Sequence, residues 1–343
     1  MKLKMLIRRK YLPITITVSL FIATYLLAAL KYPGLLTPQV LFYLLIDNSF
    51  ILISAIGMTF VILTGGIDLS VGPMIAFTAM ISAWLVEVLY ISPLATIPIV
   101  LLVGILFGAI IGSMIQFFNV PPFIATLAGF FFARGMCFII SVDAIRINHP
   151  FYKAASSFQI RLPGNSFVSI SVVVALLVVV LGIYLAHYTN FGRTVYAIGG
   201  NESSATLMGL PVPRVKVLVY TFNGFCSALA GVVYSIYMLS AHGWYAQGME
   251  LDVIASVVIG GTPLTGGVGY VFGTLFGVLI QGLIQTIIIF DGNLNTWWTK
   301  IVIGLLTLVF ILLQRLLSTR GRTQVISSAR KAPADSASPA AAD

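Results

Sequence analysis

The sequence predicts an all-α polytopic membrane protein with about ten transmembrane helices, some of them broken by glycines, and with both termini in the cytoplasm. Hydrophobic residues make up 59% of its 343 residues and charged residues only 8%, whereas a soluble domain carries about 25% charge. This composition excludes a water-soluble globule. Apolar stretches of about 20 residues, the length that spans a bilayer, recur along almost the whole chain. Lys and Arg, 19 against 10 Asp and Glu, gather at the two ends and in one loop, which favours membrane topology over nucleic-acid binding.

Nine apolar runs are long enough to cross the bilayer. They cover residues 12–30, 40–64, 69–90, 94–115, 123–141, 167–187, 217–240, 270–290 and 297–317. A tenth segment, residues 251–268, is shorter and contains glycines, so hydropathy alone leaves open whether it crosses the membrane or re-enters.

The positions of Lys and Arg indicate how many crossings to expect. Five cations lie within the first ten residues, and five more lie between Arg315 and Lys331. Because cytoplasmic segments carry the excess of Lys and Arg, both ends are expected inside, and the number of crossings is then even. Residues 251–268 are therefore predicted to cross as a tenth element. This topology places residues 188–216 inside and residues 142–166 outside.

The two ends of the chain differ in character. The apolar run after the N-terminal cations exceeds the usual length of a signal-peptide core, and no clear A-x-A cleavage site precedes Lys31, so we expect an uncleaved first span. From Ser318 the sequence turns to Ser, Ala, Pro and scattered charge, which predicts a disordered cytoplasmic tail over residues 318–343. Residues 1–317 then form the membrane domain.

The sequence lacks the motifs of ATP hydrolysis and of catalysis. None of the eight lysines follows a glycine, so the chain has no P-loop to hold nucleotide phosphates. The three histidines are scattered, and no nucleophile elbow or zinc-binding helix occurs. We therefore expect no catalytic residues, no metal site and no cofactor in this chain, and an intramembrane enzyme is disfavoured.

One glycine motif occurs twice. GGIDLSVG begins with Gly65 and Gly66, and GGTPLTGG begins with Gly260 and Gly261. Glycine pairs let a helix unwind beside a translocation path, but they also let two helices pack closely. The sequence leaves both interpretations open.

Charged residues inside the predicted spans are few, and each is a functional candidate. Asp68 lies in the first glycine break, where it could contact a substrate or cap a helix. Arg134 lies well inside the fifth span, where it could serve transport, snorkel to the interface or form an ion pair. Ion coupling needs acids at depth, and these are scarce. A self-contained ion-coupled carrier or channel is therefore kept only as the alternative function.

A neutral, hydroxyl-rich solute driven by an external motor needs no such charges, because amide, hydroxyl and aromatic side chains can replace its hydration. The candidates expected to face the outer side are Asp47, Asn48, Asn223, Trp244 and Tyr245. For the two aromatic residues, a place in the interfacial aromatic belt is the alternative.

The cytoplasmic loop between the sixth and seventh spans carries the strongest local signal. A short helix is expected over residues 203–208, with Asn201 as its cap, Glu202 in its first turn and Gly209 at its end. A capped helix on the cytoplasmic face suits contact with a soluble partner, and an interfacial connector helix is the alternative.

Four stretches of the chain resemble those of a known family in the same order. They are GMTFVILTGGIDLSVG (57–72), VPPFIATLAGFFFARG (120–135), FGRTVYAIGGNESSATLMGLPV (191–212) and VIGGTPLTGGVGYVFGT (258–274). The chain resembles, over about residues 10–317, the membrane permeases of bacterial sugar ABC importers of the ribose, xylose and galactoside class. Within that class it looks most like a permease of a galactofuranose importer.

The resemblance implies a pore-forming subunit in a bacterial inner membrane rather than a complete transporter. A second permease, in the galactofuranose case a non-identical sibling, would complete the pore. A cytoplasmic ATPase would bind ATP and Mg, and a periplasmic binding protein would deliver the sugar, helped by the outer loop over residues 142–166. The cytoplasmic loop, which Gly209 closes, would dock into the ATPase through Gly199, Gly200, Asn201, Glu202 and Ala205.

Overall fold

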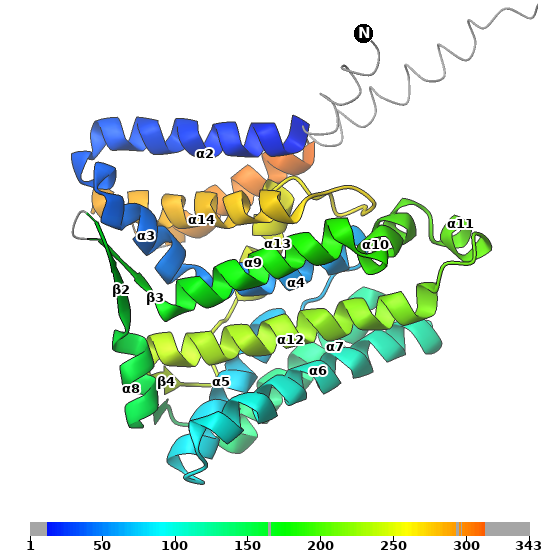
Figure 1. The fold of residues 1–343 in the computed structure, drawn as a ribbon, viewed down its shortest axis with the longest axis horizontal. Coiled ribbons are helices and arrows are strands. Elements are labelled where there is room, and N and C mark those ends of the chain that lie inside the picture. The colour runs from blue at the N-terminus through cyan, green and yellow to red at the C-terminus, as the bar shows by residue number, and fades with distance from the viewer. Residues whose placement is uncertain (1–11, 164–165, 293–294, 296, 313–343) are drawn as a thin grey trace, which may run out of the picture.

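The computed structural model describes residues 12–163, 166–292, 295 and 297–312 of the chain. Within these residues the protein is a bundle of helices with two short antiparallel ribbons at one end (Figure 1). The helices are α2 (Leu12–Lys31), α3 (Pro38–Asp47), α4 (Ser49–Leu63), α5 (Val71–Glu87), α6 (Pro93–Phe117), α7 (Pro122–Ile140), α8 (Pro150–Ser157), α9 (Ile170–Tyr188), α10 (Asn190–Gly200), α11 (Glu202–Leu207), α12 (Val212–Met238), α13 (Met249–Ile259) and α14 (Val271–Asp291), followed by a helix over Trp297–Leu312. A 3-10 helix covers Pro33–Leu36, and the strands are β1 (Ile145–Arg146), β2 (Gln159–Leu162), β3 (Ser166–Ser169) and β4 (Ser240–Ala241).

Helices lie in all ten segments that were predicted to cross the membrane, but their lengths differ. Among the described residues, six helices are long and apolar enough to cross, and seven spans result if α3 and α4, which meet at a bend of 58°, count as one. α5 has 17 residues and α13 only 11, because each adjoins a glycine break. Ten crossings therefore remain a prediction. The cationic N-terminus and the tail over residues 318–343 lie outside the described residues.

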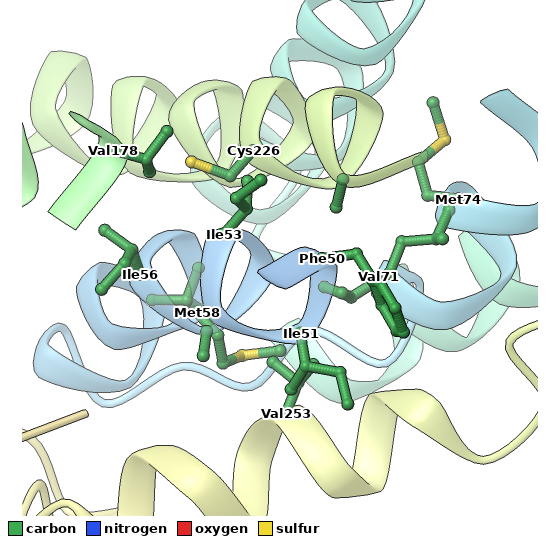
Figure 2. Packing of buried hydrophobic residues seen from close by; sticks show 14 of the residues in the cluster. Phe50, Ile51, Ile53, Ile56, Met58, Val71, Met74, Val178, Cys226 and Val253 are labelled. Carbon is green, nitrogen blue, oxygen red and sulfur yellow. The ribbon is translucent and has the colours of Figure 1, made fainter. Parts of the chain in front are cut away.

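α4 forms the centre of the bundle. All its residues are buried, because its sequence, SFILISAIGMTFVIL, is apolar or small on every side. Val178 of α9, Cys226 of α12 and Val253 of α13 lie around it in one hydrophobic cluster (Figure 2). The glycine break that follows α4 is therefore attached to the most buried helix of the protein.

α6 and α12 pack with almost no side chains between them. A Cβ atom built on Gly108 would lie 2.2 Å from the carbonyl oxygen of Tyr220, and one on Gly104 would lie 2.5 Å from that of Gly224. Small residues permit this close approach, as is common between transmembrane helices. The contact fixes α12, which carries several of the predicted site residues.

The two ends of the bundle carry different structures (Figure 1). The strand pairs β1–β4 and β2–β3 lie at the end where α8 lies, and α10 and α11 lie at the opposite end, where α2 begins. Glu87, at the end of α5, accepts hydrogen bonds from the backbone amides of Asn148 and His149, which holds the start of α8 against the bundle. Residues 142–166, expected only as a loop, thus include a helix and short strands, whereas the described chain as a whole is mostly helical, as predicted.

Candidate functional site

The first glycine break is an unwound segment between α4 and α5. α4 ends at Leu63, and Gly65 has a φ of +80°, a left-handed conformation that glycine adopts without strain. Gly66 lies against α12, where a Cβ atom would be 2.4 Å from the hydroxyl of Tyr220. The helix resumes only at Val71, so the structure has the discontinuity that the motif suggested.

Asp68 ties this break to α12. Its carboxylate is buried and accepts hydrogen bonds from the backbone amide of Ser70 at 2.8 Å and from the Ser70 hydroxyl at 2.5 Å. Its second oxygen accepts a hydrogen bond from the Nδ2 of Asn223 at 2.8 Å. Three donors therefore satisfy the carboxylate inside the protein, as a buried charge requires.

Asn223 does not face the outer side, contrary to the expectation. It is fully buried, because it lies near the middle of α12 rather than at its end. Its side chain bonds to Asp68 and packs against Gly57 of α4, where a Cβ atom would be 2.6 Å from its Oδ1. The pair is thus a buried link between three parts of the bundle.

The second glycine break combines the two interpretations that the sequence left open. Gly260 packs closely on α14, since its Cβ atom would lie 2.7 Å from the backbone of Gly273. Gly261 has a φ of +96° and begins the turn that leads out of α13. Close helix packing and a break in the helix therefore occur side by side in this motif.

The two breaks contact each other directly. The amide of Gly267 donates a hydrogen bond to the carbonyl of Leu63 at 2.9 Å. A Cβ atom on Gly266 would lie 2.7 Å from the backbone nitrogen of Gly65. The repeated motif was the only signal of this contact in the sequence, and it gave no reason to place the two copies together.

The loop between α10 and α11 has the local structure that the sequence predicted. The Oδ1 of Asn201 accepts a hydrogen bond from the amide of Ser204 at 2.8 Å and caps α11. Glu202 forms an ion pair of 2.9 Å with Lys216 of α12. Ala205, within α11, is fully buried. α11 ends at Leu207, shortly before Gly209.

The sequence analysis missed the most exposed apolar residues of this loop. Leu207 is 88% exposed and Met208 is 67% exposed, although both follow a buried alanine. Gly200 is also exposed, with no atom within 4 Å of a Cβ placed on it. Two large apolar side chains after a run of Ser, Thr and Ala were the available signal. They form an exposed apolar tip on this loop.

Asp47 and Asn48 lie where α3 bends into α4. Asp47 is exposed, and its carboxylate accepts a hydrogen bond from the hydroxyl of Tyr237 at 3.1 Å. Asn48 is only 3% exposed and donates to the carbonyl of Leu44 at 2.9 Å. Asp47 is therefore accessible to a solute, whereas Asn48 faces the protein interior and corrects the expectation that both face outward.

A row of aromatic rings joins this bend to the loop after β4. The ring of Phe50 lies 5.9 Å from that of Tyr237 and 4.9 Å from that of Tyr234, which lies 5.9 Å from that of Tyr245. Asp47 and Tyr245, two of the predicted contact residues, thus belong to one cluster. Tyr237, which the sequence analysis did not single out, joins Asp47 to Phe50 in this cluster.

Arg134 holds the loop that carries the predicted aromatic contacts. It is buried in α7, and its Nη1 donates hydrogen bonds to the carbonyls of Gly243 and Tyr245. Trp244 between them is 56% exposed, with its ring 5.2 Å from that of Phe138. The guanidinium therefore fixes the backbone of this loop, and the Trp244 side chain remains exposed.

The part of the chain that the structure describes holds no cluster of three or more His, Cys, Asp or Glu side chains that could bind a metal ion. Acidic side chains among these residues instead accept hydrogen bonds, as Asp68 does from Ser70 and Asn223, or form ion pairs, as Glu202 does with Lys216.

Comparisons with known proteins match almost the whole chain. A family model described as branched-chain amino acid transport system / permease component matches residues 40–311. The inner membrane ABC transporter permease protein YjfF of Escherichia coli is 50% identical, over 90% of this chain and 93% of its own. The fructose import permease protein FruG of Bifidobacterium longum is 41% identical, over 90% and 92% of the two chains. The ribose import permease protein RbsC of Haemophilus influenzae is 38% identical, over 78% and 82%. No solved structure matches the chain.

Proposed function

Because the chain belongs to the family of branched-chain amino acid transport system permease components, we propose that it is the pore-forming subunit of an ATP-driven sugar importer in a bacterial inner membrane. Relatives named as fructose and ribose import permeases support a monosaccharide as the solute. The observation that carries the proposal is the loop of α10 and α11. It presents an exposed apolar tip, Leu207 and Met208, on a chain that has no P-loop of its own.

Three protein partners follow from this function. A cytoplasmic ATPase binds α11 and supplies hydrolysis, with ATP and Mg bound to that separate chain. A second permease, a non-identical sibling, completes the pore. A periplasmic binding protein delivers the sugar to the end where α8 and the strands lie. The pore then alternates its access as ATP binding moves α11.

The solute within the monosaccharides is proposed to be galactofuranose, on the resemblance of the sequence motifs. A panel of sugars tests it, with the ATPase activity of the reconstituted complex measured in the presence of each loaded binding protein. Galactofuranose should give the strongest stimulation, and stimulation by ribose or fructose alone would reassign the solute.

Co-purification tests the function itself against a self-contained carrier. The permease should be isolated from its native membrane with an ATPase subunit, and uptake in vesicles should stop when ATP is withheld. The alternative, an ion-coupled carrier or channel, requires that the purified chain alone transport sugar in response to an ion gradient.

The topology that goes with this function has ten crossings and cytoplasmic termini. α2 begins at the end of the bundle where α11 lies (Figure 1), and the N-terminal cations favour the same side. Reporter domains fused to each terminus should both be active in the cytoplasm. A periplasmic C-terminus would mean an odd number of crossings and would remove α13 from the count.

A further inference from the structure

Gly199, the penultimate residue of α10, lies against the backbone of both glycine breaks. A Cβ atom on Gly199 would lie 1.8 Å from the carbonyl oxygen of Leu63 and 2.4 Å from the nitrogen of Gly267. In turn, a Cβ atom on Gly267 would lie 2.8 Å from the carbonyl oxygen of Gly199. The amide of Gly267 also donates a hydrogen bond to the carbonyl of Leu63 at 2.9 Å. The backbones of α10, of the end of α4 and of the second break therefore meet at one point, which we call the joint.

A second contact holds α10 to the same loop. The hydroxyl of Tyr196 donates a hydrogen bond to the carbonyl of Gly269 at 2.8 Å. Tyr196 and Gly199 are three residues apart and therefore lie on one face of α10. This face is fastened to the second break at two points and to the end of α4 at one.

We infer that Gly199 is a positioning residue that ties the α10–α11 loop to both glycine breaks, so that a movement of α11 displaces the two breaks together. The inference rests on the proposed function, in which an ATPase moves α11. α10 leads directly into α11 through Asn201. A displacement of α10 is passed to the two breaks, because their backbones are in direct contact and no flexible side chain between them can absorb it.

The first break passes the movement further into the bundle. This break follows Leu63, whose carbonyl oxygen faces Gly199. It contains Asp68, whose carboxylate accepts a hydrogen bond from Asn223 of α12. The second break leads into α14 at Val271. Gly199 thus lies beside the end of α4, and next to the two breaks that lead to α12 and α14.

Replacing Gly199 with alanine adds one methyl group at the joint and tests it. Real Cβ atoms essentially never approach a heavy atom closer than 3.0 Å, and the atoms facing Gly199 belong to backbone rather than to flexible side chains. Gly199→Ala must therefore push α10 away from both breaks. Gly135→Ala is the matched control, because Gly135 also lies in a helix but has no atom within 4 Å of its Cβ position.

The experiment uses the full complex of permease, ATPase and binding protein in vesicles. We expect Gly199→Ala to lower both the stimulation of ATP hydrolysis by the loaded binding protein and the sugar uptake at least about tenfold, each divided by the amount of ATPase that the variant binds. Gly135→Ala should match the parent in both. Stimulation and uptake within about twofold of the parent in Gly199→Ala would overturn the inference. A parent chain that binds no ATPase would instead overturn the proposed function.

Amide hydrogen exchange on the parent complex covers the case in which Gly199→Ala does not assemble. The joint must stay closed to transmit movement, so the amide of Gly267 should be equally protected with and without ATP. Rapid exchange of that amide in either state would show that the joint opens during the cycle, and the inference would then be wrong.

Discussion

Asn223 donates a hydrogen bond to Asp68 across 2.8 Å, and this bond joins α12 to the break between α4 and α5. Both residues are buried. The bond therefore sets the position of a discontinuous helix, and its two members offer a reciprocal test.

Asn223→Asp should destabilise the protein, because it places two carboxylates at hydrogen-bond distance in a buried site. One of them must then stay protonated at a cost of about 2 kcal/mol or more. Adding Asp68→Asn restores one charged and one amide partner, so the double variant should regain most of the lost thermal stability in detergent. Ser227→Ala, which removes only a bond within α12, is the control. Equal stability of the single and double variants would show that the pair does not act as a link.

Leu207→Asp should weaken binding of the ATPase without destabilising the permease. The side chain is 88% exposed, so the substitution costs little in the isolated chain, but a charge in a desolvated interface typically weakens binding by about tenfold or more. Binding of the ATPase to immobilised permease measures the effect. Ser157→Asp adds the same charge at an exposed position of α8, at the opposite end of the bundle, and should leave binding near the parental value. Unchanged binding by Leu207→Asp would place the docking surface elsewhere.

The ion pair between Glu202 and Lys216 predicts a rescue by charge exchange. Because Glu202 is about half exposed, the pair contributes only about 0.5 kcal/mol to stability, and Glu202→Lys should leave the melting temperature nearly unchanged. Uptake should fall about tenfold, since α11 loses its attachment to α12. Glu202→Lys with Lys216→Glu should recover more than half of the uptake. A double variant as inactive as the single one would mean that the Glu202 carboxylate binds the partner directly.

Which of these features a sequence can predict follows from their range along the chain. The cap at Asn201 and the helix end before Gly209 depend on neighbouring residues, and both were predicted. The ten apolar segments were predicted for the same reason, since hydropathy is a local sum. The contact of Leu63 with Gly267 and the inward position of Asn223 depend on how distant helices pack, which local periodicity does not determine.

The end of the bundle where α8 and the strands lie shows the same limit. The bend at Asn48 separates α3 from α4 within one apolar run, and hydropathy gave no sign of it. Asn48 packs there against Gly282 of α14, a residue more than 230 positions away in the sequence. Similarly, residues 142–166 carry no strong periodicity, and their strands form by pairing. β1 pairs with β4, almost a hundred residues away in the sequence.

The last helix makes an ion pair that tests its place in the bundle. The Nζ of Lys300 lies 2.5 Å from the Oδ2 of Asp252 in α13, whose side chain is 12% exposed. Lys300→Met leaves this carboxylate without its partner and should lower stability by about 1 kcal/mol, because Lys300 itself is half exposed to solvent. Asp252→Asn added to Lys300→Met removes the unpaired charge and should restore thermal stability. If Lys300→Met alone is as stable as the parent and as the double variant, this ion pair does not help to hold the helix over Trp297–Leu312 in place.

Asp47 is a predicted solute contact that carries a charge and that the structure leaves accessible, and we expect its charge to matter for transport rather than for folding. A carboxylate accepts stronger hydrogen bonds from sugar hydroxyls than an amide does, so Asp47→Asn should lower the uptake rate about fivefold with little change in melting temperature. Tyr237→Phe removes the hydroxyl that orients this carboxylate and should produce a smaller loss in the same assay. Tyr43→Phe, an exposed tyrosine on the same helix α3, controls for the loss of a hydroxyl. Full uptake by Asp47→Asn would exclude the carboxylate from the path of the sugar and leave the exposed Trp244 and the partly buried Tyr245 as the remaining candidate contacts.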